Sequence, residues 1–132
     1  MAVFVDTSAL YALLDAQDRF QTDAARIWAS LRAGQDDLVT TNYVILEVTT
    51  LAHRRLGFEA ARAVHDGLVP VLSVQWITES LHRLAVSAFH VGGQRNLSLV
   101  DCVSFEVMRA WGIKRAFAFD ADFTTNGFEL LP

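Results

Sequence analysis

Short apolar or β-branched runs alternate along this chain with segments in which apolar residues recur every three or four positions. Such runs are typical of strands in a parallel sheet, and the wider spacing is typical of helices. Strands are predicted over 2–6, 38–41, 70–74, 116–119 and 128–131; helices over 7–14, 21–32, 42–56, 58–65, 77–89 and 98–111; and a polar loop over 92–96. Strands that alternate with helices predict an α/β fold with a parallel sheet covered on both faces.

Polar residues at the predicted helix starts suggest where each helix begins. Thr7 or Ser8 is expected to cap the first helix, and Asn42 the helix over 42–56. Ser98 and Asp101 form an S-x-x-D pattern, which predicts a capping box for the helix through residue 111.

Composition fits one globular domain over residues 1–132. At 132 residues the chain can bury about two-thirds of its unfolded surface in a single core. It is 52% hydrophobic, and its mean hydropathy of +0.27 is high for a soluble protein of this size. A sheet buried on both faces explains this value, and an exposed apolar patch for a partner or a second copy would add to it.

The charge balance bears on possible partners and location. A net charge of −4 argues against a nucleic-acid binder, which usually carries a basic surface, unless several acids are neutralised by a bound metal. The single cysteine, Cys102, fits a reducing compartment. No run approaches the length of a membrane span and no basic leader precedes the first strand, so we expect a cytoplasmic protein without a membrane segment.

Five carboxylates stand in unusual positions. Asp6 and Asp120 end two strand-like runs, Asp122 follows shortly after, and Glu47 and Asp101 lie within apolar stretches of predicted helices. Ligands of parallel sheets bind outside the carboxyl ends of the strands. Capping alone could explain Asp6 or Asp101, whereas a carboxylate on the apolar side of a helix, as at Glu47, has no local explanation.

If these acids converge, their repulsion requires compensation. The repulsion between two carboxylates about 5 Å apart costs roughly 3 kcal/mol at an effective dielectric near 20. Either some of the acids are protonated, with raised pKa values, or a cation is bound. Oxygen ligands favour Mg²⁺ or Mn²⁺ over zinc, and the four histidines lack ligand spacing. Such a centre suits hydrolysis of a phosphodiester.

Several segments together resemble the PIN-domain ribonucleases. They are FVDTSAL at 4–10, TTNYVILE at 40–47, LSLVDC at 97–102, AFDADF at 118–123, GF at 127–128 and LP at 131–132. The resemblance spans the chain in order, and the compact size resembles the VapC-type toxins of bacterial toxin–antitoxin pairs. It implies an α/β/α sandwich with a mostly parallel sheet of four or five strands, whose acids hold one or two Mg²⁺ or Mn²⁺ ions and cleave RNA.

The resemblance also assigns residues. The family's catalytic acids match Asp6, Glu47, Asp101 and Asp120, its often acidic further metal position matches Asp122, and its supporting hydroxyls match Thr7, Ser8 and Ser98. It implies Asp6 and Asp101 as direct ligands and Asp120 as a ligand directly or through water. Glu47 would orient the attacking water or a second ion. The family further implies a homodimer and an antitoxin partner covering the acidic cleft.

One competing interpretation from another class has the right length. A receiver-like regulatory domain also carries an acidic Mg²⁺ pocket, but it needs a lysine at the end of a late strand, and Lys114 precedes its strand. A phosphatase with a D-x-D nucleophile would need a long chain after Asp122. The RNA itself cannot be named, because Arg54, Arg55 and Arg95 are equally compatible with RNA contacts and with ordinary surface charges.

Overall fold

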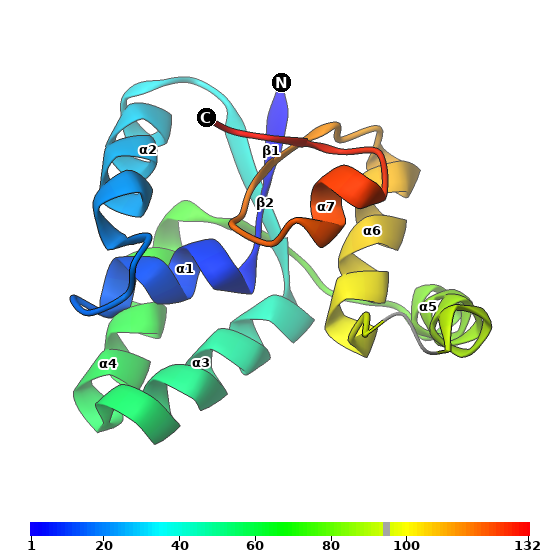
Figure 1. The fold of residues 1–132 in the computed structure, drawn as a ribbon, viewed down its shortest axis with the longest axis horizontal. Coiled ribbons are helices and arrows are strands. Elements are labelled where there is room, and N and C mark those ends of the chain that lie inside the picture. Colours follow the sequence, from blue (N-terminus) through cyan, green and yellow to red (C-terminus); the bar gives the residue numbers. More distant parts are fainter. Residues whose placement is uncertain (94–95) are drawn as a thin grey trace.

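A five-stranded parallel sheet forms the centre of the molecule. The computed structural model describes residues 1–93 and 96–132. Its strands, β1 (Ala2–Val5), β2 (Asp37–Thr41), β3 (Ser73–Gln75), β4 (Arg115–Phe117) and β5 (Glu129–Leu130), are ordered β3-β2-β1-β4-β5 (Figure 1). The prediction of a parallel α/β sheet is therefore confirmed.

The direction of strand addition reverses at β1. The chain first places β2 and β3 on one side of β1 and later places β4 and β5 on its other side. Phe4 pairs with Val39 of β2 and with Ala116 of β4, so β1 is paired along both edges. In sheets of this kind, ligands bind at such a reversal, next to the carboxyl ends of the strands. The gap between the ends of β1 and β4 is therefore the expected place for a site.

Helices cover both faces of the sheet. They are α1 (Thr7–Leu14), α2 (Gln21–Ala33), α3 (Asn42–Leu56), α4 (Phe58–Ala63), α5 (Glu79–Gly92), α6 (Leu99–Trp111) and α7 (Asp122–Thr125). Figure 1 shows α1 and α2 on one side of β1 and β2, and α6 on the other. This arrangement is the α/β/α sandwich that the family resemblance implied.

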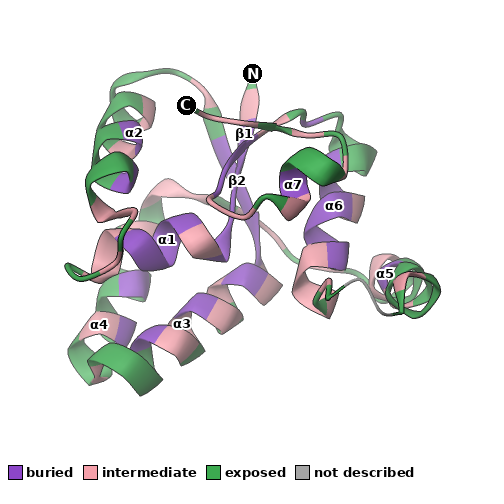
Figure 2. Cartoon of the chain, viewed as in Figure 1, coloured by how far each residue is buried: buried purple, intermediate pink, exposed green. Residues whose placement is uncertain are grey.

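Aromatic side chains fill the core next to β1 and β4. Phe4, Phe117 and Phe123 are fully buried, and Phe105 of α6 packs edge-on against Phe123 with ring centroids 5.0 Å apart. Figure 2 shows the buried residues concentrated in the strands and on the inner faces of the helices. The carboxyl ends of β1 and β4 therefore extend from a densely packed aromatic core.

The strand predicted over 70–74 is confirmed only over residues 73–74. The chain forms a π-helical turn over Val64–Leu68 and a 3₁₀ turn over Val69–Val71, and β3 begins only at Ser73. Pro70 lies within the 3₁₀ turn, where its fixed φ and missing N–H are tolerated. The expected strands at 116–119 and 128–131 are shorter, ending at Phe117 and Leu130.

The predicted cap of α3 is also wrong. Thr41 caps this helix, because its hydroxyl accepts the Val44 N–H at 3.1 Å. The side chain of Asn42 instead accepts the backbone N–H of Ile77 at 2.8 Å and thereby fixes the segment between β3 and α5. Residues 94 and 95 of the predicted loop over 92–96, including Arg95, lie outside the described residues.

α5 lies at the edge of the molecule. Ala85 is its one buried residue, and most of its circumference faces solvent (Figure 2). Leu84 and Val91 on this helix are 53% and 90% exposed. Among the described residues, no helix combines the length and the apolar character needed to cross a membrane.

Candidate metal centre

Asp6 occupies the carboxyl end of β1 and is nearly inaccessible to solvent. Its carboxylate accepts hydrogen bonds from the Ser8 N–H at 3.1 Å and the Ser8 hydroxyl at 2.6 Å. Asp6, and not Thr7 or Ser8, is therefore the N-cap of α1. Burial raises its pKa from 3.8 to about 6, although the bonds from Ser8 oppose this rise, and the negative charge of Glu47 adds to it.

The Ser8 hydroxyl connects the ends of two neighbouring strands. It donates to Asp6 after β1 and accepts the backbone N–H of Phe119, after β4, at 3.0 Å. One residue further along, Asp120 accepts the Asp122 N–H at 2.9 Å. Asp6 and Asp120 are separated by most of the chain, and the hydrogen bonds of Ser8 to both strand ends hold them beside each other.

Asp101 approaches the same place from the first turn of α6. The Ser98 hydroxyl accepts the Asp101 N–H at 3.1 Å, as the predicted cap requires. Burial, followed by the negative charges of Asp6 and Asp120, raises the pKa of Asp101 from 3.8 to about 7. Asp101 is thus both part of a helix cap and part of the acidic cluster.

The acids converge in one cavity of about 330 Å³. It is lined by most of the residues named from the sequence, namely Asp6, Thr7, Ser8, Glu47, Ser98, Asp101 and Asp120. Asp122 does not line it, but its carboxylate lies with those of Asp101 and Asp120 in a group whose ligand atoms are all within 4.8 Å of one another. Burial and the neighbouring Asp120 raise the pKa of Asp122.

The residues present suit a hard divalent cation. In the part of the chain that the structure describes, none of the five acids forms an ion pair with a basic side chain. The Thr7 hydroxyl oxygen beside them is buried and lacks a hydrogen-bond partner within those residues. Several carboxylates and a free hydroxyl, without histidine or cysteine, form the oxygen donor set that Mg²⁺ and Mn²⁺ prefer.

The cavity also contains residues that sequence reasoning did not single out, namely Tyr11, Asp18, Phe20, Leu51 and Phe119. Arg55, which the sequence left open between an RNA contact and an ordinary surface charge, lines it as well, with its guanidinium 5.4 Å from the centre of the Tyr11 ring. Arg55 had no distinguishing signal in the sequence, because a basic residue in the last turn of a helix is ordinarily explained by the helix dipole. Its place beside the acids depends on how α3 packs against α1.

Comparison with known proteins agrees with this geometry. Residues 3–129 match the model of the PIN domain family. The chain belongs to the PIN domain family, which confirms the resemblance inferred from the motifs and replaces the receiver-like alternative.

Within this family the chain is similar to a particular nuclease. It is 40% identical over 127 residues to the 23S rRNA-specific endonuclease VapC20 of two Mycobacterium tuberculosis strains, covering 96% of this chain and 95% of the relative. The crystal structure of that protein, described as a sarcin-ricin loop cleaving toxin, superposes with a TM-score of 0.88 at 38% identity and 96% coverage of both chains. FitAcB from Neisseria gonorrhoeae, at 12% identity, shares the fold, with a TM-score of 0.68 over 98% of this chain and 96% of that one.

Proposed function

We propose that this chain is a Mg²⁺- or Mn²⁺-dependent endoribonuclease that cleaves a phosphodiester bond of ribosomal RNA. The observation that carries the proposal is the convergence of four acids, without basic partners among the described residues, at the carboxyl ends of β1 and β4. The similarity to VapC20, an endonuclease specific for 23S rRNA, supports ribosomal RNA as the substrate class.

Each acid has a distinct proposed role. Asp6 and Asp101 would hold the ion directly, and Asp120 would hold it directly or through water. Asp122, which lies with Asp101 and Asp120 in the acidic group, is a further ligand. A divalent ion held by these residues would supply positive charge at the phosphate and would lower the pKa of a water for attack.

Glu47 and the hydroxyl groups position the reactants. Glu47 lines the cavity from α3, where its carboxylate could accept a proton from the attacking water or hold a second ion. Ser8 keeps the Asp6 carboxylate fixed by donating to it, and Ser98 keeps Asp101 fixed by capping α6. Thr7 offers a hydroxyl with no competing partner among the described residues.

The biological role follows from the same similarity. We infer that the protein is the toxin of a toxin–antitoxin pair, acts in the cytoplasm to stop translation, and forms a homodimer whose acidic cleft is covered by its antitoxin. Exposed apolar side chains such as Leu46, Trp76 and Val91 supply surface for such contacts.

Cleavage of purified ribosomes tests the proposal. Mn²⁺ should permit cleavage and EDTA should abolish it, with the cut mapped by sequencing the new RNA ends. Asp101→Asn should lower the rate roughly 100-fold or more, the scale of losing a group that stabilises transition-state charge. Asp23→Asn is the matched control, because Asp23 also lies in the first turn of a helix, away from the cavity. Undiminished cleavage by Asp101→Asn, or in EDTA, would contradict the proposal.

A further inference from the structure

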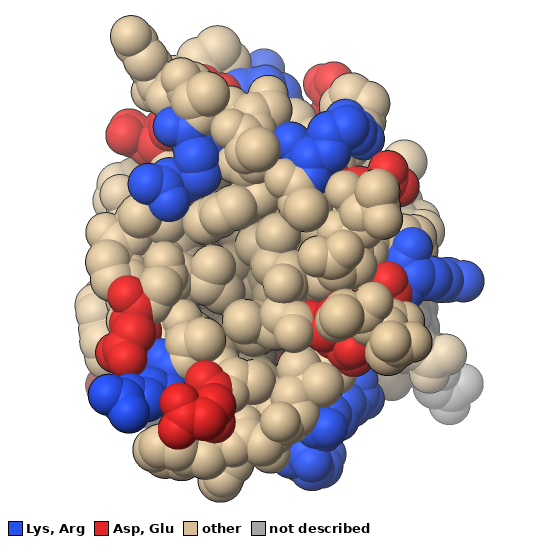
Figure 3. Space-filling view, turned by 90° about the vertical axis from the view of Figure 1, so that its left-hand side faces the viewer, with Lys and Arg blue, Asp and Glu red and all other residues tan. Residues whose placement is uncertain are grey.

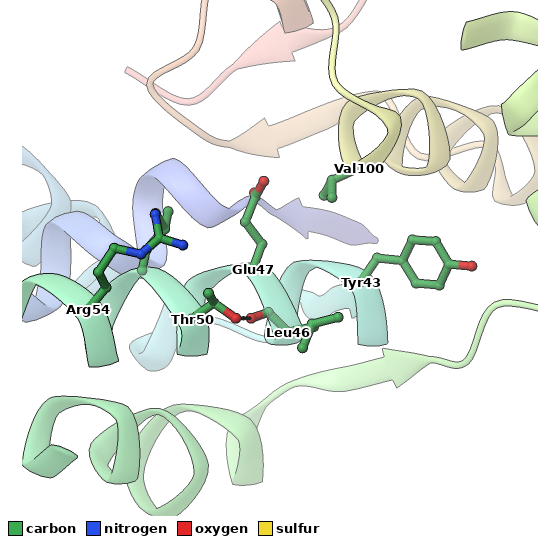
Figure 4. A pocket seen from close by; sticks show the side chains of 7 residues that line it. Tyr43, Leu46, Glu47, Thr50, Arg54 and Val100 are labelled. Atoms are coloured by element: carbon green, nitrogen blue, oxygen red, sulfur yellow. Dashed lines mark hydrogen bonds between the residues drawn. The ribbon is translucent and has the colours of Figure 1, made fainter. Parts of the chain in front are cut away.

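A second hollow adjoins the acidic cavity. It has a volume of about 400 Å³, within the range of small-ligand sites, and is lined by Tyr43, Leu46, Glu47, Thr50, Leu51, Arg54 and Val100 (Figure 4). Glu47 and Leu51 line both hollows, so the two share a wall. A ligand that extends out of the acidic centre along α3 would enter this second hollow directly.

The walls of the second hollow are mainly apolar. Leu46, Leu51 and Val100 contribute aliphatic surface, and Leu46 is 68% exposed. The phenol of Tyr43 is held by a hydrogen bond to the ring of His82, on α5. An apolar hollow beside a rigid aromatic ring suits a flat, partly apolar group such as a nucleobase.

A basic side chain stands at the end of this hollow opposite Tyr43. In Figure 4, Arg54 and Glu47 extend from the same side of α3. Arg54 forms neither an ion pair nor a cation–π contact among the described residues. Of the other described arginines, Arg19, Arg32 and Arg55 lie over aromatic rings, and the rest form ion pairs, namely Arg26, Arg62, Arg83, Arg109 and Arg115. The helix dipole favours a basic residue in this turn, but it does not account for the unpaired guanidinium beside an apolar hollow.

The charge on the rest of the surface makes Arg54 more important for binding RNA. On the face formed by α1, α2 and α4, basic and acidic side chains occur in small groups separated by broad uncharged areas (Figure 3). With a net charge of −4, the protein has little overall attraction for a polyanion. An RNA strand therefore depends on individual arginines next to the acidic centre.

We propose that this second hollow binds the nucleotide adjoining the bond that is cut, and that it contributes to the choice of cleavage site. The base lies against Leu46, Leu51 and Val100, and a backbone phosphate pairs with Arg54. The inference rests on the proposed ribonuclease function, and it adds a recognition site to the acids that carry out the cleavage.

Removal of Arg54 tests the phosphate contact. With synthetic RNA containing the cut site, Arg54→Ala should raise KM about tenfold and leave kcat unchanged. The slope of log KM against log salt should fall by about 0.7, the value for one phosphate contact to a single strand. Arg54→Lys should restore the slope. Arg32→Ala is the matched control, because Arg32 is also a basic residue in the last turn of its helix. An unchanged KM and slope would overturn the phosphate contact.

Filling the hollow tests the base contact. Thr50 is exposed at its edge, so Thr50→Trp should fill it without altering the core, while Ala29→Trp places the same ring on the exposed surface of α2. RNA randomised around the cut site is cleaved and the products are sequenced. The wild type and Ala29→Trp should share a base preference at a position flanking the cut, and Thr50→Trp should lose it or cleave at least tenfold more slowly.

The two proposals fail in different ways. Loss of metal-dependent cleavage in the wild type would overturn the ribonuclease function itself. A cleaving wild type whose base preference and rate survive in Thr50→Trp would overturn only the recognition site, and would assign the hollow to another ligand such as a protein segment. If Thr50→Trp does not fold, Ala substitution of Leu46, which is exposed, gives the same comparison, because it removes one wall of the hollow.

Discussion

Replacement of Asp6 by Asn should stabilise the metal-free protein while removing its response to metal. Asn keeps a side-chain oxygen that can accept the Ser8 N–H, and Asn and Asp are comparable N-caps, so the start of α1 should be preserved. The substitution differs from the wild type mainly in charge. It therefore isolates the cost of holding an ionised carboxylate in this buried position.

The size of this cost follows from the pKa of Asp6. Its rise from 3.8 to about 6, at 1.36 kcal/mol per pKa unit, corresponds to about 3 kcal/mol at neutral pH and above. The pKa is raised in the folded state, so the cost is absent at low pH, develops between about pH 4 and 6, and is complete above that range. Asn does not ionise. The free energy of unfolding of the variant should therefore exceed that of the wild type by less than about 1 kcal/mol at pH 4 and by about 3 kcal/mol at pH 8.

Urea unfolding in EDTA at several pH values measures this difference directly. A difference of about 3 kcal/mol corresponds to roughly 10 °C in Tm for a chain of this length. Addition of Mn²⁺ at 100 times its Kd should then stabilise the wild type by about 2.7 kcal/mol and leave the variant almost unchanged. Asp23→Asn, at an exposed position, is the control and should show neither effect.

Two results would refute this reasoning. If wild type and Asp6→Asn differ by the same amount at pH 4 and pH 8, the Asp6 carboxylate is not strained by burial. If Mn²⁺ stabilises both proteins equally, the ion is held without Asp6. Either result would require a different distribution of charge in the cavity from the one that the structure shows.

Two further predictions concern stability. Ser98→Ala should destabilise the protein by about 1 kcal/mol in urea unfolding, because it removes the N-cap of α6, and Ser98→Thr should recover most of the loss; full stability of the alanine variant would show that the cap is replaceable. Phe123→Ala should lower the free energy of unfolding by about 3–5 kcal/mol, because its ring is fully buried against Phe4 and Phe105. Phe58→Ala, at a 65% exposed position, should change stability little. Equal losses of stability in the two variants would contradict the assigned core.

The sequence was informative about the fold because periodicity and topology agree. A helix between two apolar runs carries the chain back to the start of the sheet and so favours parallel strands, and the structure contains five such strands. The error at 70–72 has a local cause: the valine and leucine of that segment are typical of a strand, but Pro70 favours the 3₁₀ turn.

The acidic residues could be named from the sequence, but their arrangement could not. Asp6 and Asp120 were predictable as strand ends, since parallel strands share a carboxyl edge. The roles of Ser8, as a link between two strand ends, and of Arg54, beside an apolar hollow, depend on contacts between elements far apart in the sequence. No local pattern distinguishes such a serine or arginine from an ordinary surface residue.

The position of β1 between β2 and β4 has a consequence for synthesis of the protein. β1 is made long before β4, so Phe4 acquires its second neighbour only when Ala116 has been made. Until then one edge of the most buried strand is unpaired, and the aspartates of the site are apart. The nascent chain therefore lacks the complete acidic cluster until Asp120 has been made and β4 has joined β1.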